Sequence, residues 1–167
     1  MSKQRIKGRF LNVVTQSIRL PNGKVKNVEM VKHPGAVVIV PFLSQSEVIL
    51  LRQFRPVINR YIYELPAGTL EPDERTSTCA RRELQEETGY KAKKLIRLGA
   101  LYPVPGYSTE KLVLYKAEGL TPSGLTCEED EVIETRIFKK NQIKELFYSG
   151  KINDAKTICG LVMCGWL

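Results

Sequence analysis

The sequence has only one histidine, His33, among its 167 residues. This scarcity excludes Ser-His-Asp and Cys-His mechanisms and histidine-rich metal sites, unless His33 itself takes part. His33 precedes Pro34 and Gly35, so we expect it to serve a turn at the entry to a strand. The four cysteines are scattered without a C-x-x-C pair, which is typical of reduced thiols and argues against a zinc site.

Long hydrophobic runs are also missing. The longest, such as residues 36–43, fall far short of the ~20 residues of a membrane span, and the basic N-terminus lacks the apolar core of a signal peptide. We therefore expect a soluble, cytoplasmic protein with no membrane partner. A chain of this length that is 43% hydrophobic and 26% charged has the composition of one globular domain.

The formal net charge of +8 is the main global bias of the composition. It indicates either attraction to a polyanionic ligand or simply a lysine-rich surface. The basic residues are dispersed, and no zinc-finger spacing or aromatic-basic RNA-binding signature occurs, which argues against nucleic acid as a partner. A nucleotide-sized anion is enough to explain the charge.

The most distinctive stretch is residues 68–90, GTLEPDERTSTCARRELQEETGY. On a helix, Glu83 and Glu87 are neighbours on one face and Glu86 lies beside them. Like charges at this spacing destabilise a helix by a few tenths of a kcal/mol, so the pattern indicates a neutralising cation. Arg82 can reach Glu86 at i,i+4, while the other two glutamates lack a local partner. A hard divalent ion such as Mg²⁺ prefers oxygen ligands of this kind.

Taken alone, these glutamates are equally typical of a solvated helix face. The flanking residues predict a defined unit: Gly68 a close backbone approach, Asp73 the N-cap of the helix, and Gly89 its C-terminal glycine. The carboxylates are then expected to face outward. We expect three residues of the helix on its core side: Cys79, Ala80 and Leu84.

The spacing matches every fixed position of the Nudix box: Gly68, five residues, Glu74, seven residues, Arg82-Glu83-Leu84, one residue, Glu86-Glu87, one residue, Gly89-Tyr90. The chain therefore resembles the Nudix hydrolases, which cut a diphosphate linked to another moiety. The resemblance implies Mg²⁺, with Mn²⁺ as a substitute, held by the Ala67 carbonyl, Glu83 and Glu87, with Arg82 and Glu86 as further catalytic residues. It also implies an α/β (α+β) fold with a mixed sheet sandwiched between helices.

Residues 52–68, RQFRPVINRYIYELPAG, resemble the segment before the box in the ADP-ribose pyrophosphatase subgroup. By chemistry alone, Arg52 and Arg55 suit phosphate recognition, although exposed arginines are common on any surface. The resemblance implies that Arg55 binds the substrate and that Glu64 is a polar residue on the strand leading to the site. Arg52 is a further candidate substrate ligand.

The loop of residues 103–110 carries a second subgroup signal. Its prolines and glycine indicate a shaped turn. The ADP-ribose subgroup carries a proline after the box at the place of Pro105, which is followed here by Gly106, so both are candidate substrate-binding residues. Enzymes that act on nucleotide sugars such as GDP-mannose share much of this signal.

An acidic loop, residues 127–131, precedes a strand expected at 132–138. In isolation such a loop is typical of a solubility patch. Beside a metal site, one carboxylate could deprotonate the attacking water. The resemblance implies a glutamate of this loop as the base, with Glu131 as the best match and Glu129 as the alternative.

The remaining segments complete the expected fold. We expect an N-terminal antiparallel hairpin at 8–31, turning at Pro21-Asn22-Gly23, and a central hairpin of strands 35–42 and 47–54. Further expected elements are strands at 95–102 and 111–118 and helices at 140–148 and 154–166, the last capped by Asn153 or Asp154. The chain divides into a β subdomain, 1–34, and a catalytic domain, 35–167. The hairpin is too small to bury itself, so we expect a homodimer that exchanges it.

The function expected from these signals is Mg²⁺-dependent hydrolysis of ADP-ribose, a nucleotide-sugar substrate, to AMP and ribose 5-phosphate. Alternative substrates are GDP-mannose and oxidised nucleoside triphosphates. A further alternative is a Nudix-fold nucleotide- or RNA-binding module without turnover. Such modules usually lose box carboxylates, and none is lost here.

Overall fold

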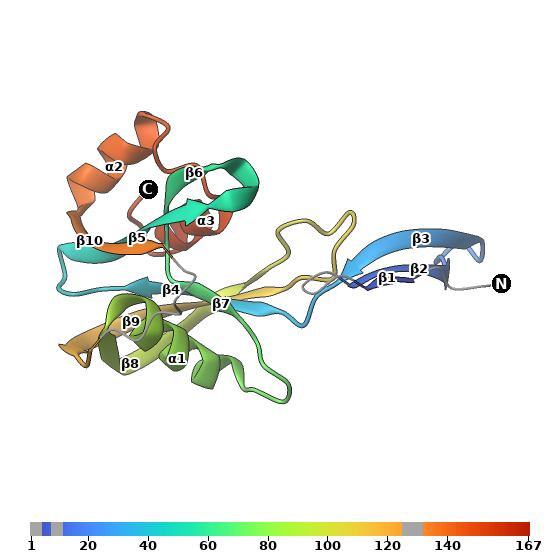
Figure 1. Cartoon of the computed structure of the whole chain (residues 1–167), viewed down its shortest axis with the longest axis horizontal. Helices are drawn as coiled ribbons and strands as arrows, with labels where there is room; N and C mark the ends of the chain where they lie inside the picture. Colours follow the sequence, from blue (N-terminus) through green and yellow to red (C-terminus); the bar gives the residue numbers. More distant parts are fainter. Residues whose placement is uncertain (1–4, 8–11, 125–131) are drawn as a thin grey trace.

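The computed structural model of the chain describes residues 5–7, 12–124 and 132–167. The N-terminal part forms its own antiparallel sheet of β1 (Arg5–Lys7), β2 (Asn12–Arg19) and β3 (Val25–Lys32), in the order β1-β2-β3. This sheet lies apart at one end of the molecule (Figure 1). The predicted hairpin is confirmed, and Gly23 has the positive φ of 81° that its turn requires.

A mixed sheet forms the centre of the molecule. Its strands, in spatial order, are β7 (Ala67–Thr69), β4 (Ala36–Pro41), β9 (Leu112–Pro122) and β8 (Tyr90–Leu101). β4 and β9 are parallel, and the other two pairs are antiparallel. Alternate residues of β4 enter two separate cores, because side chains of a strand point to opposite faces. Val37 packs in the core that contains α1 (Thr76–Thr88), and Val38 in the core that contains residues of α3 (Ala155–Met163).

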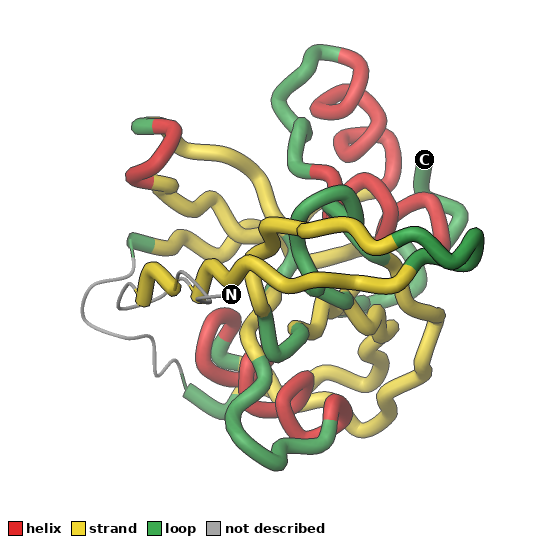
Figure 2. Tube along the Cα trace, turned by 90° about the vertical axis from the view of Figure 1, so that its right-hand side faces the viewer, coloured by secondary structure: helices red, strands yellow, loops and turns green. Residues whose placement is uncertain are grey.

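A second antiparallel sheet has the order β10 (Ile133–Lys139), β5 (Glu47–Arg55), β6 (Arg60–Glu64). A 3-10 turn, η1 (Pro56–Ile58), joins β5 to β6, and α2 (Lys140–Tyr148) follows β10. Figure 2 shows α1 on one side of the strands and the two C-terminal helices on the other, as the predicted sandwich requires. No helix in the described ranges is long and apolar enough to cross a membrane.

The predicted central hairpin is wrong. β4 and β5 are joined by a short turn and a single bridge between Phe42 and Val48, after which they enter different sheets. The reason is that a strand has two edges, and β7 and β9 occupy both edges of β4. β5 therefore pairs with β6 and β10 instead.

The other boundaries follow the sequence closely, with two main differences. β8 starts directly after the helix, five residues before the predicted 95–102, and the short strands β1, β6 and β7 were not predicted. The C-terminal helix is capped by Asp154, one of the two predicted residues, whose side chain accepts a hydrogen bond from the Thr157 N–H.

His33 has the expected turn role, because its Nδ1 accepts a hydrogen bond from the Gly35 N–H at 3.0 Å.

Candidate active site

Helix α1 carries the acidic residues of the box and ends as predicted. Gly89 adopts a left-handed conformation, φ 75°, and its N–H donates to the Gln85 carbonyl. The predicted N-cap is wrong: the helix begins at Thr76 with Arg75 at the N-cap position, and Asp73 lies in the preceding turn with φ 60°. Asp73 is part of a turn that is closed by the hydrogen bond from the Glu74 N–H to the Glu71 carbonyl, and the helix starts only after this turn.

The strand β7 passes directly beneath the acidic face of α1. A Cβ atom on Gly68 would lie 1.8 Å from the carboxyl carbon of Glu83 and 1.8 Å from its Oε1. No side chain fits in that space, so glycine is required for the Glu83 carboxylate to rest on the strand backbone. The predicted close approach at Gly68 is thereby confirmed.

Glu87 approaches the same strand one residue earlier. Its Oε2 accepts a hydrogen bond of 2.9 Å from the Ala67 N–H, and the residue is only 5% exposed. Two hydrogen bonds fix the pattern of the β4–β7 ladder: Ile39 N–H donates to Pro66 O, and Leu70 N–H donates to Gly35 O. Hydrogen-bonded and non-hydrogen-bonded pairs alternate along an antiparallel ladder, so Val38 and Ala67 form a non-hydrogen-bonded pair. The N–H and carbonyl of Ala67 are therefore directed away from β4.

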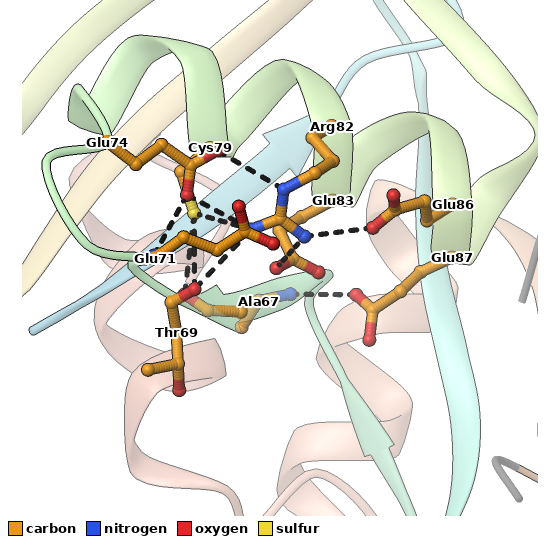
Figure 3. A network of polar contacts seen from close by, with 10 residues as sticks. Ala67, Thr69, Glu71, Glu74, Cys79, Arg82, Glu83, Glu86 and Glu87 are labelled. Atoms are coloured by element: carbon orange, nitrogen blue, oxygen red, sulfur yellow. Dashed lines mark hydrogen bonds and ion pairs between the residues drawn. The ribbon is translucent and has the colours of Figure 1, made fainter. Parts of the chain in front are cut away.

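Two of the three box carboxylates thus converge on the backbone of residues 67–68 (Figure 3). The expectation that all carboxylates face outward is wrong for Glu87, because that side chain is buried against β7. Glu86 is the most accessible, with 37% of its side chain exposed. The core side of the helix is as predicted, because Cys79, Ala80 and Leu84 are fully buried.

Arg82 is the cation at the centre of this network (Figure 3). Its Nη1 lies 2.7 Å from Glu83 Oε1 and 2.9 Å from Glu86 Oε2, and its Nη2 lies 3.1 Å from Glu74 Oε2. The prediction that Glu83 lacks a local partner is therefore wrong, because one guanidinium reaches both glutamates. The hydrogen bond from Arg82 holds the pKa of Glu74 below its usual value, and the surrounding carboxylates raise the pKa of Arg82.

The donors at this site fit a hard divalent ion. The Gly68 backbone leaves room for one carboxylate, a second carboxylate lies beside Ala67, and the donor atoms are oxygens, which Mg²⁺ and Mn²⁺ accept. Within the described ranges, no group of three His, Cys, Asp or Glu side chains is arranged to hold a metal ion. Of the three carboxylates predicted to crowd together, Glu83 and Glu86 meet at Arg82, whereas Glu87 contacts the Ala67 N–H. Arg82 instead partly neutralises Glu83 and Glu86.

The two arginines predicted to bind substrate lie on opposite faces of β5, since they are three residues apart on one strand. Arg55 forms an ion pair with Glu64: its Nε donates a hydrogen bond of 2.8 Å to Glu64 Oε2, and its Nη2 lies 2.6 Å from the same oxygen. Arg52 instead pairs with Glu134 at 2.9 Å and stacks over the Tyr61 ring at 3.9 Å. The structure therefore places Arg55 with Glu64 and separates it from Arg52.

Sequence reasoning missed Lys156 at this location. Its Nζ lies 3.0 Å from Glu64 Oε1 and 3.1 Å from Asp154 Oδ2, and Glu64 is 3% exposed. The adjacent Thr157 hydroxyl accepts from the Leu65 N–H at 2.8 Å. The N-cap signal at Asp154 located the start of α3, but no local pattern brings Lys156 to a residue 92 positions away.

Two further predicted site residues lie on the loop between β8 and β9. Pro105 and Gly106 occupy an exposed turn whose loop bonds to β3, through Val31 N–H to Tyr107 O at 2.8 Å and Thr109 N–H to Val31 O at 3.0 Å. The candidate bases Glu129 and Glu131 lie outside the described residues.

Cys79 lies beneath the network with the properties of a structural thiol. Burial, followed by the nearby Glu74, raises the pKa of Cys79 to about 12. Its Sγ lies 3.7 Å from the Thr69 carbonyl and accepts from Arg82 Nη2 at 3.4 Å. A thiol with this pKa stays protonated and is a poor nucleophile.

Comparison with known proteins agrees with this geometry. An ADP-ribose pyrophosphatase of Bacillus subtilis (strain 168) is 38% identical over 157 residues, which cover 93% of this chain and 85% of that protein. A methanol dehydrogenase activator of Bacillus methanolicus is 31% identical over 159 residues, covering 94% and 86%. A GDP-mannose pyrophosphatase of Yersinia pestis (strain Pestoides F) is 35% identical over 133 residues, covering 74% and 67%.

A solved structure described as an ADP compounds hydrolase superposes with a TM-score of 0.84 at 24% identity, covering 98% of this chain and 90% of that one. This likeness confirms the predicted mixed sheet between helices. A family model of the NUDIX domain matches residues 32–159. In this structure Glu83 and Glu87 of the box lie against β7, where Gly68 leaves space for a carboxylate. The chain therefore belongs to the Nudix hydrolase family.

Proposed function

We propose that this enzyme hydrolyses ADP-ribose to AMP and ribose 5-phosphate. The observation that carries the proposal is the convergence of Glu83 and Glu87 on the backbone of Ala67 and Gly68, which gathers oxygen donors at one edge of the sheet. The choice of substrate is supported by the 38% identity to an ADP-ribose pyrophosphatase over most of both chains.

We assign Mg²⁺ as the metal, with Mn²⁺ as a substitute. Glu83, Glu87 and the Ala67 carbonyl would hold it, and when bound it supplies charge neutralisation of the diphosphate and activation of the attacking water. Arg82 orients Glu83 and Glu86, with which it already forms ion pairs. Its charge also limits the repulsion among these carboxylates.

Arg55 is the residue that we assign to the diphosphate. Its guanidinium lies at the end of β5 with 41% of the side chain exposed, so it is accessible to an anion. Arg52, Glu64, Pro105 and Gly106 remain proposed contacts of the substrate or of the groups that hold it. Glu131, or Glu129 as the alternative, is proposed as the base that takes a proton from the attacking water.

GDP-mannose is the second candidate substrate, since similarity to GDP-mannose pyrophosphatases covers 74% of this chain. A panel of ADP-ribose, GDP-mannose and an oxidised nucleoside triphosphate separates the possibilities. Each reaction is run with Mg²⁺, with Mn²⁺ and with a chelator, and the products are identified by mass spectrometry. We expect AMP and ribose 5-phosphate, formed from ADP-ribose only when a metal ion is present, as the main products. Binding of nucleotide or RNA without turnover of any panel member would reject the enzymatic proposal.

We also propose that residues 1–34 form a dimerisation subdomain and residues 35–167 the catalytic domain, with the hairpin exchanged in a homodimer. In support, β1, β2 and β3 form a sheet separate from the other two. The free thiols of the three described cysteines suit a reducing compartment, and we place the enzyme in the cytoplasm.

A further inference from the structure

Glu64, the last residue of β6, is a buried carboxylate shared by two cations. It is 3% exposed. Its Oε2 accepts from Arg55, at 2.8 Å from Nε and 2.6 Å from Nη2, and its Oε1 accepts from Lys156 Nζ at 3.0 Å. Each oxygen of the carboxylate therefore has its own cationic partner.

The two cations differ in how firmly they are held. The Arg55 side chain is 41% exposed, whereas that of Lys156 is 16% exposed. Lys156 also contacts Asp154 Oδ2 at 3.1 Å, and Asp154 caps the same helix by accepting from the Thr157 N–H. Lys156 is thus part of a packed helix start, while Arg55 borders solvent.

Helix α3 is fixed to the same strand end by a separate contact. The Leu65 N–H, which follows Glu64 directly, donates to the Thr157 hydroxyl at 2.8 Å. That hydroxyl in turn donates to Asp154 Oδ2 at 2.6 Å. The backbone beside Glu64 therefore keeps its position even if the Lys156 charge is removed.

The arrangement has an energetic consequence for an anion that attracts Arg55. A buried carboxylate that loses its only cation is strongly destabilised, because its desolvation is no longer compensated. With Lys156 on the second oxygen, Glu64 stays paired when the Arg55 guanidinium turns away. The free energy required to release Arg55 is correspondingly smaller.

From this we infer that Lys156 is a positioning residue, which holds Glu64 so that Arg55 is released to the diphosphate of the substrate. The inference rests on the proposed role of Arg55 in substrate binding. Lys156 does not touch the substrate in this scheme. Its effect should therefore appear in KM much more than in kcat.

The kinetic test compares Lys156→Met with the wild-type enzyme on ADP-ribose. For Lys156→Met we expect KM to rise at least about tenfold and kcat to change less than about threefold. Lys156→Arg should restore KM towards the wild-type value. Lys144→Met, at an exposed lysine of α2, should leave both constants unchanged. Lys156→Gln, which retains a hydrogen-bond donor, is measured in parallel in case the Met variant folds poorly. An unchanged KM in a folded Lys156 variant would overturn the inference.

A double-mutant cycle with Arg55→Ala separates positioning from general damage. Arg55→Ala should itself raise KM, and Lys156→Met should then add nothing, because the two side chains act through one carboxylate. An equal KM increase from Lys156→Met in both backgrounds would assign Lys156 a purely structural role. If Arg55→Ala leaves KM unchanged, Arg55 does not bind the anion and the inference falls.

Hydrogen exchange of the Arg55 Nε–H, followed by NMR without ligand, is independent of activity. Exchange should be slower in Lys156→Met, because Arg55 is then the only cation beside Glu64 in the part of the chain that the structure describes. Unchanged exchange would overturn the inference even in an enzyme that cleaves ADP-ribose. Slower exchange in a protein that does not cleave ADP-ribose would support the Lys156–Glu64–Arg55 coupling and reject the proposed substrate.

Discussion

Gly68 shows how one residue type sets the geometry of the box. The Glu83 carboxylate occupies the space that a Cβ would need, so Gly68→Ala must displace the carboxylate. The displaced group is the end of a flexible side chain near the surface. The change should therefore affect the metal site more than the stability of the fold.

We expect Gly68→Ala to lower metal-activated kcat/KM by at least about tenfold and to shift Tm by only a few degrees, roughly the effect of ~1 kcal/mol in a chain of this size. Gly99→Ala is the matched control, since its Cβ would meet the terminal methyl of Met163, away from the box. Near-normal activation by Mg²⁺ in Gly68→Ala would contradict the geometry derived for Glu83.

The choice of base is a second question at the residue scale. Glu131→Gln should lower kcat by ~100-fold or more and leave substrate affinity nearly intact, as expected when a general base is lost. Steady-state kinetics and separate binding titrations give the two quantities. Loss of kcat in Glu129→Gln but not in Glu131→Gln would identify Glu129 as the base. If neither variant loses kcat, water activation does not depend on this loop.

At the scale of the element, α1 is fixed between an apolar core and a charged network. Its inner face packs against β4 and contains Cys79, while Arg82 on the outer side connects Glu74, Glu83 and Glu86. The thiol lies between these two environments. The protonation of the Cys79 thiol therefore depends on how closely α1 packs against β4.

The thiol of Cys79 has a pKa of about 12 in the folded protein, against 9.0 for the unperturbed group. The folded state keeps its proton where the unfolded state loses it, so the stability contribution is complete below pH 9 and is lost as pH rises towards 12. This thiol alone should lower the free energy of unfolding by up to about 1.4 kcal/mol per pH unit in that window.

Urea unfolding at several pH values from 8 to 10.5 tests this expectation. Cys79→Ala should show a shallower decline of the unfolding free energy with pH than the wild-type protein, and Cys159→Ala, at a half-buried position of α3, should decline like the wild type. Equal slopes in wild type and Cys79→Ala would mean that the thiol does not ionise on unfolding as described.

For the whole molecule, the N-terminal sheet poses the main question of assembly. Its register places Val14, Ile18, Val28 and Met30 on one face, since Val14 pairs with Met30 and alternate residues share a face. Gln16 and Lys26 lie on the same face. The apolar residues of a sheet face are normally buried against another layer. A second copy of the chain is the partner that we propose.

Light scattering at micromolar concentration should therefore give the mass of a dimer. Met30→Asp, which places a charge on the apolar face, should give a monomer. Val25→Asp is the control, because Val25 pairs with Arg19 on the opposite face and is already 62% exposed. A monomeric wild-type protein under these conditions would reject the exchanged hairpin.

The sequence by itself determined the features that depend on near neighbours. These are the box helix, its end at Gly89, the N-terminal hairpin and a helix cap at Asn153 or Asp154. They follow from i,i+4 spacing, turn residues and capping, which act within a few residues. A close backbone approach at Gly68 was also predicted, although the carboxylate of Glu83 as the group that occupies this space was not. Even here the helix start was misplaced, because a turn closed between Glu71 and Glu74 came before it.

Only the tertiary structure decided which distant groups share a partner. β4 and β5 separate because both edges of β4 are occupied, and Arg52 and Arg55 diverge because they lie on opposite faces of one strand. Lys156 reaches Glu64 across 92 positions of sequence because α3 packs against the end of β6. Such contacts depend on how whole elements pack, and local sequence patterns contain no information about that packing.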